Sequence, residues 1–127
     1  MASDIIAKPT ESELEILQIL WEKGACTVRD VHEILTLNKE AGYTTTLKLM
    51  QIMHEKGLVK RDTSAKTHIY SALASQQKTQ QHLVNKLIDN AFNGSAARLV
   101  MQALGNHQSS RDEIEAIKKY LDELDQK

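Results

Sequence analysis

The fold is decided between residues 42 and 72, where the chain reads GYTTTLKLMQIMHEKGLVKRDTSAKTHIYSA. The first half carries an inward stripe at the spacing i, i+3, i+4 and i+7, which consists of Thr46, Leu49, Met50 and Met53. The opposite side is polar and consists of Thr44, Lys48, Gln51 and Glu55. The sequence therefore predicts a helix from about Thr44 to Lys56 that stops at Gly57, with one face in a core and one face free to form hydrogen bonds.

After Gly57 the spacing of apolar residues changes from a helical period to a period of about two. Two β-prone runs, Leu58–Arg61 and His68–Ala72, flank the polar turn Asp62–Lys66. Runs of this kind on either side of a short polar turn predict a β-hairpin.

Two further helices are predicted upstream. A capping box from Thr10 to Glu13 opens a helix that continues to Lys23. Thr27 caps a second helix that runs to about Leu37. Three short helices followed by a hairpin are typical of a winged helix-turn-helix. We therefore predict a mainly α protein whose residues 1–74 form a winged-helix domain, with the hairpin as its wing.

The rest of the chain, residues 75–127, predicts three more helices. The first lies within residues 75–92, the second starts after Ser95, and a capping box at Ser110 opens the third. Three helices of this length bury too little surface to enclose a core alone. We therefore predict a three-helix dimerisation domain that uses a second copy of the chain, through the apolar positions Val84, Leu87, Ile88, Ile114, Ile117, Leu121 and Leu124.

Charge is unevenly divided along this chain of 127 residues and net charge −1. Residues 43–74 hold five Lys or Arg against two Asp or Glu, whereas residues 1–42 are acidic and residues 75–127 are balanced. A local basic segment in a near-neutral protein suggests a small contact surface for phosphates. The alternative is a solvated turn that happens to carry lysines.

Eight residues of the basic segment are candidate DNA contacts. Lys48 and Gln51 have side chains that hydrogen-bond guanine and adenine edges in a major groove. Thr44 and Thr45 lie in the first helical turn, where hydroxyl and amide groups favour a phosphate, although Thr44 also suits the N-cap. The others are Tyr43 before the helix and Lys60, Arg61 and Lys66 on the wing, where an exposed hairpin needing only solubility is the alternative. For Leu47 and Ile52, packing is the preferred interpretation.

Enzymatic and metal chemistry find little support. The five histidines lack the spacing of a metal motif, and no nucleophile elbow, P-loop or dinucleotide fingerprint occurs. The single cysteine, Cys26, excludes an intrachain disulfide and is interpreted as a packing residue. No apolar run approaches the ~20 residues of a membrane span. We therefore predict a cytoplasmic protein that is not an enzyme, is not inserted in a membrane and needs no cofactor or metal.

Several of these segments resemble the BlaI/MecI/CopY family of bacterial repressors. They are Leu20-Trp21, the helix entry Gly42–Thr46, the run Glu55–Val59 and the strand Tyr70–Ala72, and the resemblance covers about residues 8 to 125. It implies a homodimeric repressor on a palindromic double-stranded operator. It further implies control of β-lactamase or cell-wall-stress genes, released when a membrane metalloprotease sensor causes cleavage in the C-terminal domain.

Two departures from the family narrow this expectation. Copper-responsive members carry a cysteine pair near the C-terminus, whereas residues 75–127 contain no cysteine. Ile52 stands where many relatives have a basic residue, so the resemblance supports no DNA contact there.

The candidate cleavage segment consists of Asn90, Ala91, Phe92, Asn93 and Gly94, where the first tail helix breaks. Asn-Gly after an apolar pair predicts an extended stretch that a protease can enter. The alternative is an ordinary turn between two helices.

Two functions remain open at this level. The chain is either a dimeric DNA-binding repressor or a winged helix used for protein contacts without DNA. Winged helices of the second kind tend to lose the basic wing and the polar helix face, whereas this chain has its only net positive segment there. The position of the charge therefore favours the repressor.

Overall fold

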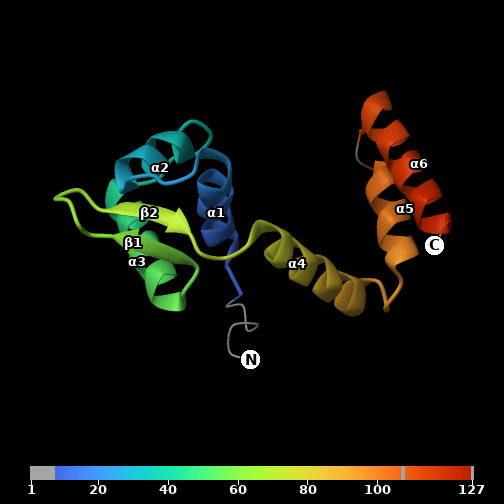
Figure 1. Cartoon of the computed structure of the whole chain (residues 1–127), viewed down its shortest axis with the longest axis horizontal. Helices are drawn as coiled ribbons and strands as arrows, with labels where there is room; N and C mark the ends of the chain where they lie inside the picture. Colours follow the sequence, from blue (N-terminus) through green and yellow to red (C-terminus); the bar gives the residue numbers. More distant parts are fainter. Residues whose placement is uncertain (1–7, 107, 127) are drawn as a thin grey trace. The chain divides into compact units, whose positions relative to one another are not determined.

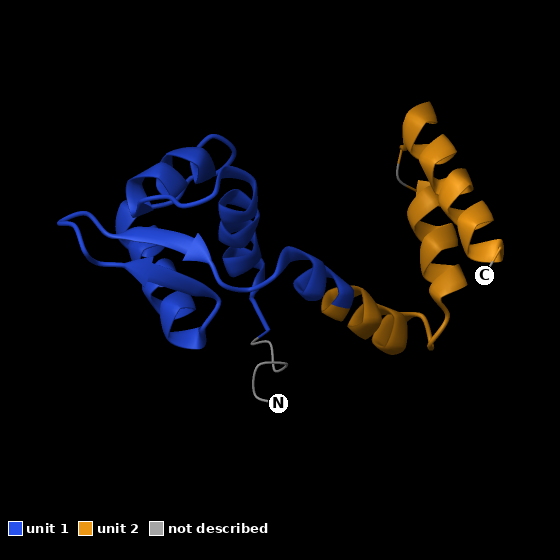
Figure 2. Cartoon of the chain, in the orientation of Figure 1, with its two compact units in different colours: residues 1–81 blue, residues 82–127 orange. Residues whose placement is uncertain are grey.

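The computed structural model describes residues 8–106 and 108–126. The chain divides into two compact units, residues 1–81 and 82–127 (Figure 2). The elements in chain order are α1 (Glu11–Lys23), α2 (Val28–Leu35), α3 (Tyr43–Lys56), β1 (Val59–Asp62), β2 (Ile69–Ala72), α4 (Gln76–Ala91), α5 (Ala96–Asn106) and α6 (Arg111–Asp125) (Figure 1). This order confirms the predicted fold class, a winged helix-turn-helix followed by three helices.

Local sequence signals explain where three of the six described helices begin. Thr10, Thr27 and Ser110 each accept a hydrogen bond from the third helical amide, and each capping box is complete. For α3 the N-cap is Gly42, so the alternative that Thr44 caps this helix is wrong. Gly57 ends α3 with φ at +82°, a conformation that glycine adopts without strain.

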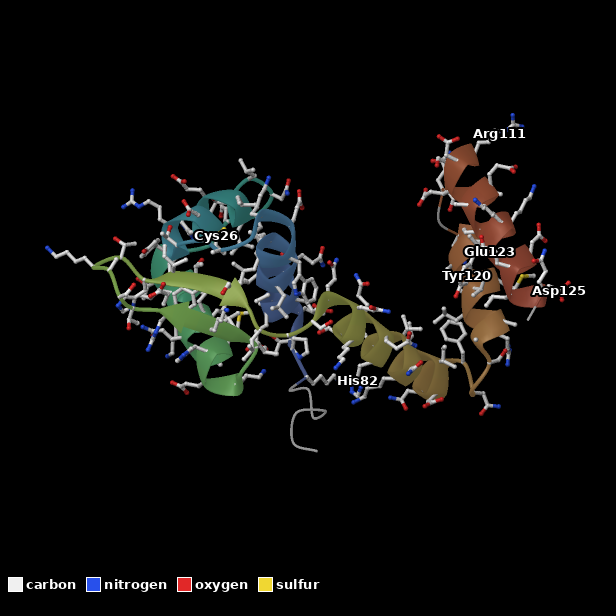
Figure 3. The ribbon with its side chains drawn as sticks, in the orientation of Figure 1. Cys26, His82, Arg111, Tyr120, Glu123 and Asp125 are labelled. Carbon is white, nitrogen blue, oxygen red and sulfur yellow. The ribbon has the colours of Figure 1, made fainter. Side chains whose placement is uncertain are left out.

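The wing is a two-stranded antiparallel hairpin. Lys60 pairs with Ser71 and Arg61 with Tyr70. On its other edge, Tyr70 forms a bridge with Cys26 through N···O distances of 2.7 and 2.8 Å. Cys26 is buried in the N-terminal unit (Figure 3), where burial and the nearby charge of Asp30 raise the pKa of its thiol. This agrees with the interpretation of Cys26 as a packing residue.

The core of the N-terminal unit forms where α1 packs on α2, α3 and β2, and where α3 packs on α2 and β1. The fully buried side chains include Ile16, Leu17, Val31, Met50, Met53, Leu58, Val59 and Tyr70. Thr46 and Met50 thus lie on the predicted inward stripe. The indole nitrogen of Trp21 donates to the carbonyl of Ala74 at 2.9 Å, which ties α1 to the chain just after the wing.

A nearly buried ion pair joins the start of α1 to the end of α3. The carboxylate of Glu13, 2% exposed, accepts from Lys56 Nζ at 2.6 Å and from the amide of Thr10 at 2.9 Å. Burial tends to raise the pKa of Glu13, but the hydrogen bonds and the charge of Lys56 outweigh it and lower the pKa below 4.5.

This lowered pKa makes a pH-dependent contribution to stability. The contribution is complete above the unfolded pKa, near 4.5, and is lost as the pH falls through the lower folded pKa. We expect Glu13→Gln to reduce the free energy of unfolding by about 1–3 kcal/mol at pH 7, because one partner of a mostly buried pair is removed while Lys56 keeps some contact with water. Urea unfolding of the wild type and the variant should show this difference shrinking from pH 5 to pH 3.

The matched control is Glu22→Gln, which removes the exposed Glu22–Lys23 pair, 3.9 Å long. It should change stability little at any pH. A difference for Glu13→Gln that stays constant between pH 7 and pH 3 would contradict the assignment.

The C-terminal unit is packed far less completely. Among the residues that the structure describes after residue 81, no side chain is buried. Of the predicted dimer positions, Ile88, Ile114 and Ile117 are half-buried, whereas Val84, Leu87, Leu121 and Leu124 are 41–55% exposed. Tyr120 on α6 is 60% exposed as well (Figure 3). The apolar stripes are therefore present but uncovered in a single chain.

The predicted boundary at residue 74 stays a prediction. α4 begins just after it, and the division between the two compact units falls inside this helix, after Gln81. Thr79 in the first turn of α4 is 1% exposed, so the start of the helix is packed within the N-terminal unit.

The candidate cleavage segment is not extended, and this expectation is corrected. Asn90 and Ala91 belong to the last turn of α4. Asn93 and Gly94 have φ angles of 51° and 83°, and the amide of Gly94 donates to the carbonyl of Ile88 at 3.0 Å. A left-handed turn of this kind satisfies the last carbonyls of a helix, which is why the chain turns tightly here.

No helix within the described ranges combines the length and the apolarity that a membrane span requires.

Candidate nucleic-acid interface

One side of α3 is exposed over its whole length. Thr44, Lys48, Gln51 and Glu55 are exposed, as predicted from the helical spacing, and Thr45 is exposed as well. Leu47 is half-buried against the core, which agrees with the packing interpretation, whereas Ile52 is 37% exposed and is not packed there. α3 therefore presents a surface of hydroxyl, amide and ammonium groups with one apolar side chain at its edge.

The first turn of α3 is held by a contact that the sequence analysis missed. His32 on α2 is hydrogen-bonded through Nδ1 to the hydroxyl of Thr46 at 2.9 Å. The His32 ring also meets the ring of Tyr43 edge-on, with 5.4 Å between centroids. Tyr43 remains 45% exposed. α2 thus positions the Tyr43 ring at the N-terminal end of the exposed face of α3.

The wing separates its basic residues onto two faces. Side chains alternate along a strand, so Arg61 shares a face with the buried Val59, whereas Lys60 points to the other face. Lys66 is exposed in the turn. Hydrogen bonds from Ser64, including its amide at 2.9 Å, lower the pKa of Asp62, so this carboxylate stays ionised.

A hollow of about 580 Å³ lies between the start of α2, the middle of α3 and the wing. Four predicted site residues line it together: Tyr43, Gln51, Arg61 and Lys66. The structure does not place Thr44, Thr45, Lys48 or Lys60 in its walls.

The hollow also contains residues that sequence reasoning missed, among them Thr27, Arg29 and His68. Arg29 is an exposed basic residue in the first turn of α2. A cation two positions after the predicted N-cap Thr27 was the available signal, but the apolar stripe of α2 gives no indication that Arg29 faces the wing.

The described histidines lie in separate segments, with His32 in α2, His54 in α3, His68 before β2 and His82 in α4. His107 lies outside the described residues. Within residues 8–106 and 108–126, no three His, Cys, Asp or Glu side chains are grouped closely enough to hold a metal ion.

These features define a winged helix-turn-helix protein with a polar helix face next to a basic wing. A sequence model of the penicillinase repressor family matches residues 9–123, and the chain belongs to this family. The predicted resemblance is thereby confirmed.

Individual relatives are distant but cover most of the chain. The methicillin resistance regulatory protein MecI of Staphylococcus aureus is 25% identical over 116 residues, which cover 88% of this chain and 91% of MecI. The transcriptional regulator BlaI of Mycobacterium tuberculosis is 26% identical over 115 residues, which cover 89% of this chain and 82% of BlaI. A solved structure of a ZitR mutant from Lactococcus lactis aligns with a TM-score of 0.47 and 20% identity, over 99% of this chain and 79% of that one.

Family membership confirms the coarser functional expectations. The family is one of transcriptional repressors, and its members are not enzymes. The chain is therefore a repressor of this family.

Proposed function

We propose that the protein is a sequence-specific repressor that binds a palindromic DNA operator as a homodimer in the cytoplasm. The observation that carries this proposal is the junction of the exposed polar face of α3 with the basic wing around one hollow. A helix of this kind fits a major groove, and a basic hairpin beside it meets the flanking backbone.

Each part of the surface has a distinct role in this proposal. Lys48 and Gln51 read base edges, because their exposed side chains stand on the side of α3 opposite the core stripe. Thr44 and Thr45 bind a phosphate at the helix N-terminus, where Gly42 provides no side-chain cap and leaves amide groups available. Tyr43 and the wing residues Lys60, Arg61 and Lys66 contact the sugar-phosphate backbone.

The homodimer is supported by the unburied apolar stripes of α4 and α6. Leucine and valine side chains that are 41–55% exposed in one chain gain burial only from a partner. A second copy is the partner proposed here, since a two-fold dimer presents two equal winged helices to a palindrome.

Induction is proposed to follow cleavage between Asn90 and Gly94 by a membrane metalloprotease sensor, with β-lactamase or cell-wall-stress genes as targets. The named relatives include a methicillin resistance regulator, and the family is that of the penicillinase repressor, which supports this class of signal. The segment is exposed at Asn90, Ala91, Asn93 and Gly94, which supports access.

The proposal is tested by base readout at Gln51. We expect Gln51→Ala to weaken binding to the cognate operator by about 1–3 kcal/mol and to relax the preference at one base pair. Fluorescence anisotropy with the operator, its single-base variants and random duplexes measures both effects. Gln18→Ala, which removes an exposed glutamine from α1, is the matched control and should bind as the wild type does.

Equal weakening of Gln51→Ala on operator and random DNA would show that Gln51 does not read bases. The operator itself comes from selection of bound fragments from a random pool. Enrichment of a palindrome is expected, and failure to enrich any sequence would favour the protein-contact module instead.

A further inference from the structure

The hollow between α2, α3 and the wing brings together three cations from three elements. Arg29 comes from the first turn of α2, Arg61 from β1 and Lys66 from the turn of the wing. Arg29 is at least 32 residues away in sequence from Arg61 and from Lys66, so only the folded chain brings the three cations together. We call this set the cation hollow.

The three cations have no anionic partner in the part of the chain that the structure describes. No carboxylate within residues 8–106 and 108–126 lies within ion-pair distance of any of them. The nearest acidic residues in sequence are engaged elsewhere, since Asp30 accepts from the amide of Thr27 at 3.1 Å and Asp62 accepts from the amide of Ser64 at 2.9 Å. Among the described residues, the cations of the hollow are therefore not paired with a carboxylate.

Arg61 shows this lack of compensation most directly. Its side chain is half-buried, and its Nε atom is sealed from solvent with no hydrogen-bond partner among the described residues. A guanidinium group held in this way by packing is poorly stabilised unless an anion approaches its remaining donors. Apolar neighbours such as Val28 and Leu47 in the same walls strengthen the attraction for such an anion.

The position of the cation hollow indicates which anion it receives. Gln51 and Tyr43, from the exposed face of α3, form part of the same walls. When that face lies in a major groove, the backbone strand at the edge of the groove passes over the neighbouring surface. The anion that reaches this surface is then a phosphodiester of the bound DNA.

We propose that the cation hollow is a binding site for a phosphate group of the DNA backbone and that Arg29 of α2 is a phosphate-binding residue. This inference rests on the proposed function and adds a third element to the DNA interface. Its consequence is positional: a phosphate fixed between α2 and the wing sets how far α3 advances along the groove, while carrying no base preference of its own.

The test compares Arg29→Gln with Arg29→Lys and with the control Lys23→Gln in the full-length protein. Lys23 is an exposed cation at the end of α1 and is outside the walls of the hollow. Binding of the operator and of a scrambled duplex is measured by anisotropy over a series of salt concentrations, after circular dichroism has confirmed the fold.

A homodimer carries two copies of Arg29, so Arg29→Gln should reduce the slope of log affinity against log salt by about two. It should weaken operator and scrambled duplex by the same factor, about tenfold or more at low salt. Arg29→Lys should keep the slope, and Lys23→Gln should behave as the wild type does.

The outcomes separate this inference from the function on which it rests. If the wild type binds the operator and Arg29→Gln keeps the affinity and the salt slope of the wild type, the cation hollow does not bind the DNA backbone. The proposed function then stands. If the wild type binds no duplex, both fail. Tripolyphosphate is titrated in parallel. If Arg29→Gln loses tripolyphosphate binding while its DNA binding is unchanged, the hollow binds a small phosphorylated ligand. That result would overturn the proposed binding site for the DNA backbone.

Discussion

Replacing Leu121 by aspartate is expected to convert the dimer into monomers. Leu121 lies on the uncovered stripe of α6 with Ile114, Ile117 and Leu124, and it is 55% exposed in the single chain. In a two-fold interface the residue occurs twice, so two carboxylates would lose their water without gaining a partner. A cost of about 4 kcal/mol or more follows, which weakens dimerisation about a thousandfold.

Sedimentation velocity over a range of protein concentrations measures this effect. Lys119→Asp is the matched control, because Lys119 is an exposed residue of the same helix on the side away from the stripe. The control should remain dimeric, and both variants should retain the helix content of the wild type. An unchanged dimer in Leu121→Asp would remove α6 from the proposed interface.

The operator affinity should fall together with the dimer. A monomer contacts one half-site only, whereas the second winged helix of a dimer binds at a high effective concentration once the first is bound. The affinity of Leu121→Asp for a full operator should therefore approach the affinity of the wild type for a single half-site.

Local signals predicted the order of elements well. The capping boxes at Thr10 and Ser110 and the N-cap Thr27 need residues only three positions apart, and all three occur as predicted. The inward stripe of α3 and the change of period after Gly57 are local as well. Such features follow from short-range sequence, which is why both the helices and the wing could be placed.

Features that join distant segments escaped prediction. The bond between His32 and Thr46 links residues on two helices, and the bridge between Cys26 and Tyr70 links residues 44 positions apart. Arg29 enters the candidate site only because α2, α3 and the wing converge. The spacing of apolar residues along the chain carries no information about which segments converge in space. The site was therefore predicted as a helix face and a wing, without the wall that α2 supplies.

At the turn after α4, in contrast, a local sequence signal was present but predicted the wrong backbone conformation. The Asn-Gly pair predicts an extended segment, but both residues adopt left-handed conformations, and the amide of Gly94 donates to the carbonyl of Ile88. A protease needs an extended stretch of backbone, so cleavage here requires the last turn of α4 to unwind first. Few buried contacts oppose this, since Asn90, Ala91, Asn93 and Gly94 are all exposed.

Cutting the chain within residues 90–94 is accordingly expected to release the operator. The cut leaves α1 to α4 on one fragment and removes α5 and α6, together with the stripe of Ile114, Ile117, Leu121 and Leu124. α4 alone offers Val84, Leu87 and Ile88, of which two are more than 40% exposed, and this surface is too small to hold two fragments together at low concentration. Each N-terminal fragment then contacts only one half-site of the operator. The operator affinity should therefore drop by about a hundredfold or more.

The experiment introduces the recognition sequence of a site-specific protease at residues 90–94 and follows anisotropy of a labelled operator during digestion. The same sequence appended after residue 127 is the control, because digestion there leaves every described helix intact. Release is expected only for the internal site, with a rate that follows the appearance of the two fragments on a gel. Tight binding by the fully cut protein would exclude cleavage of this turn as the inducing step, because the dimer would then be held by α4 and the winged helices alone.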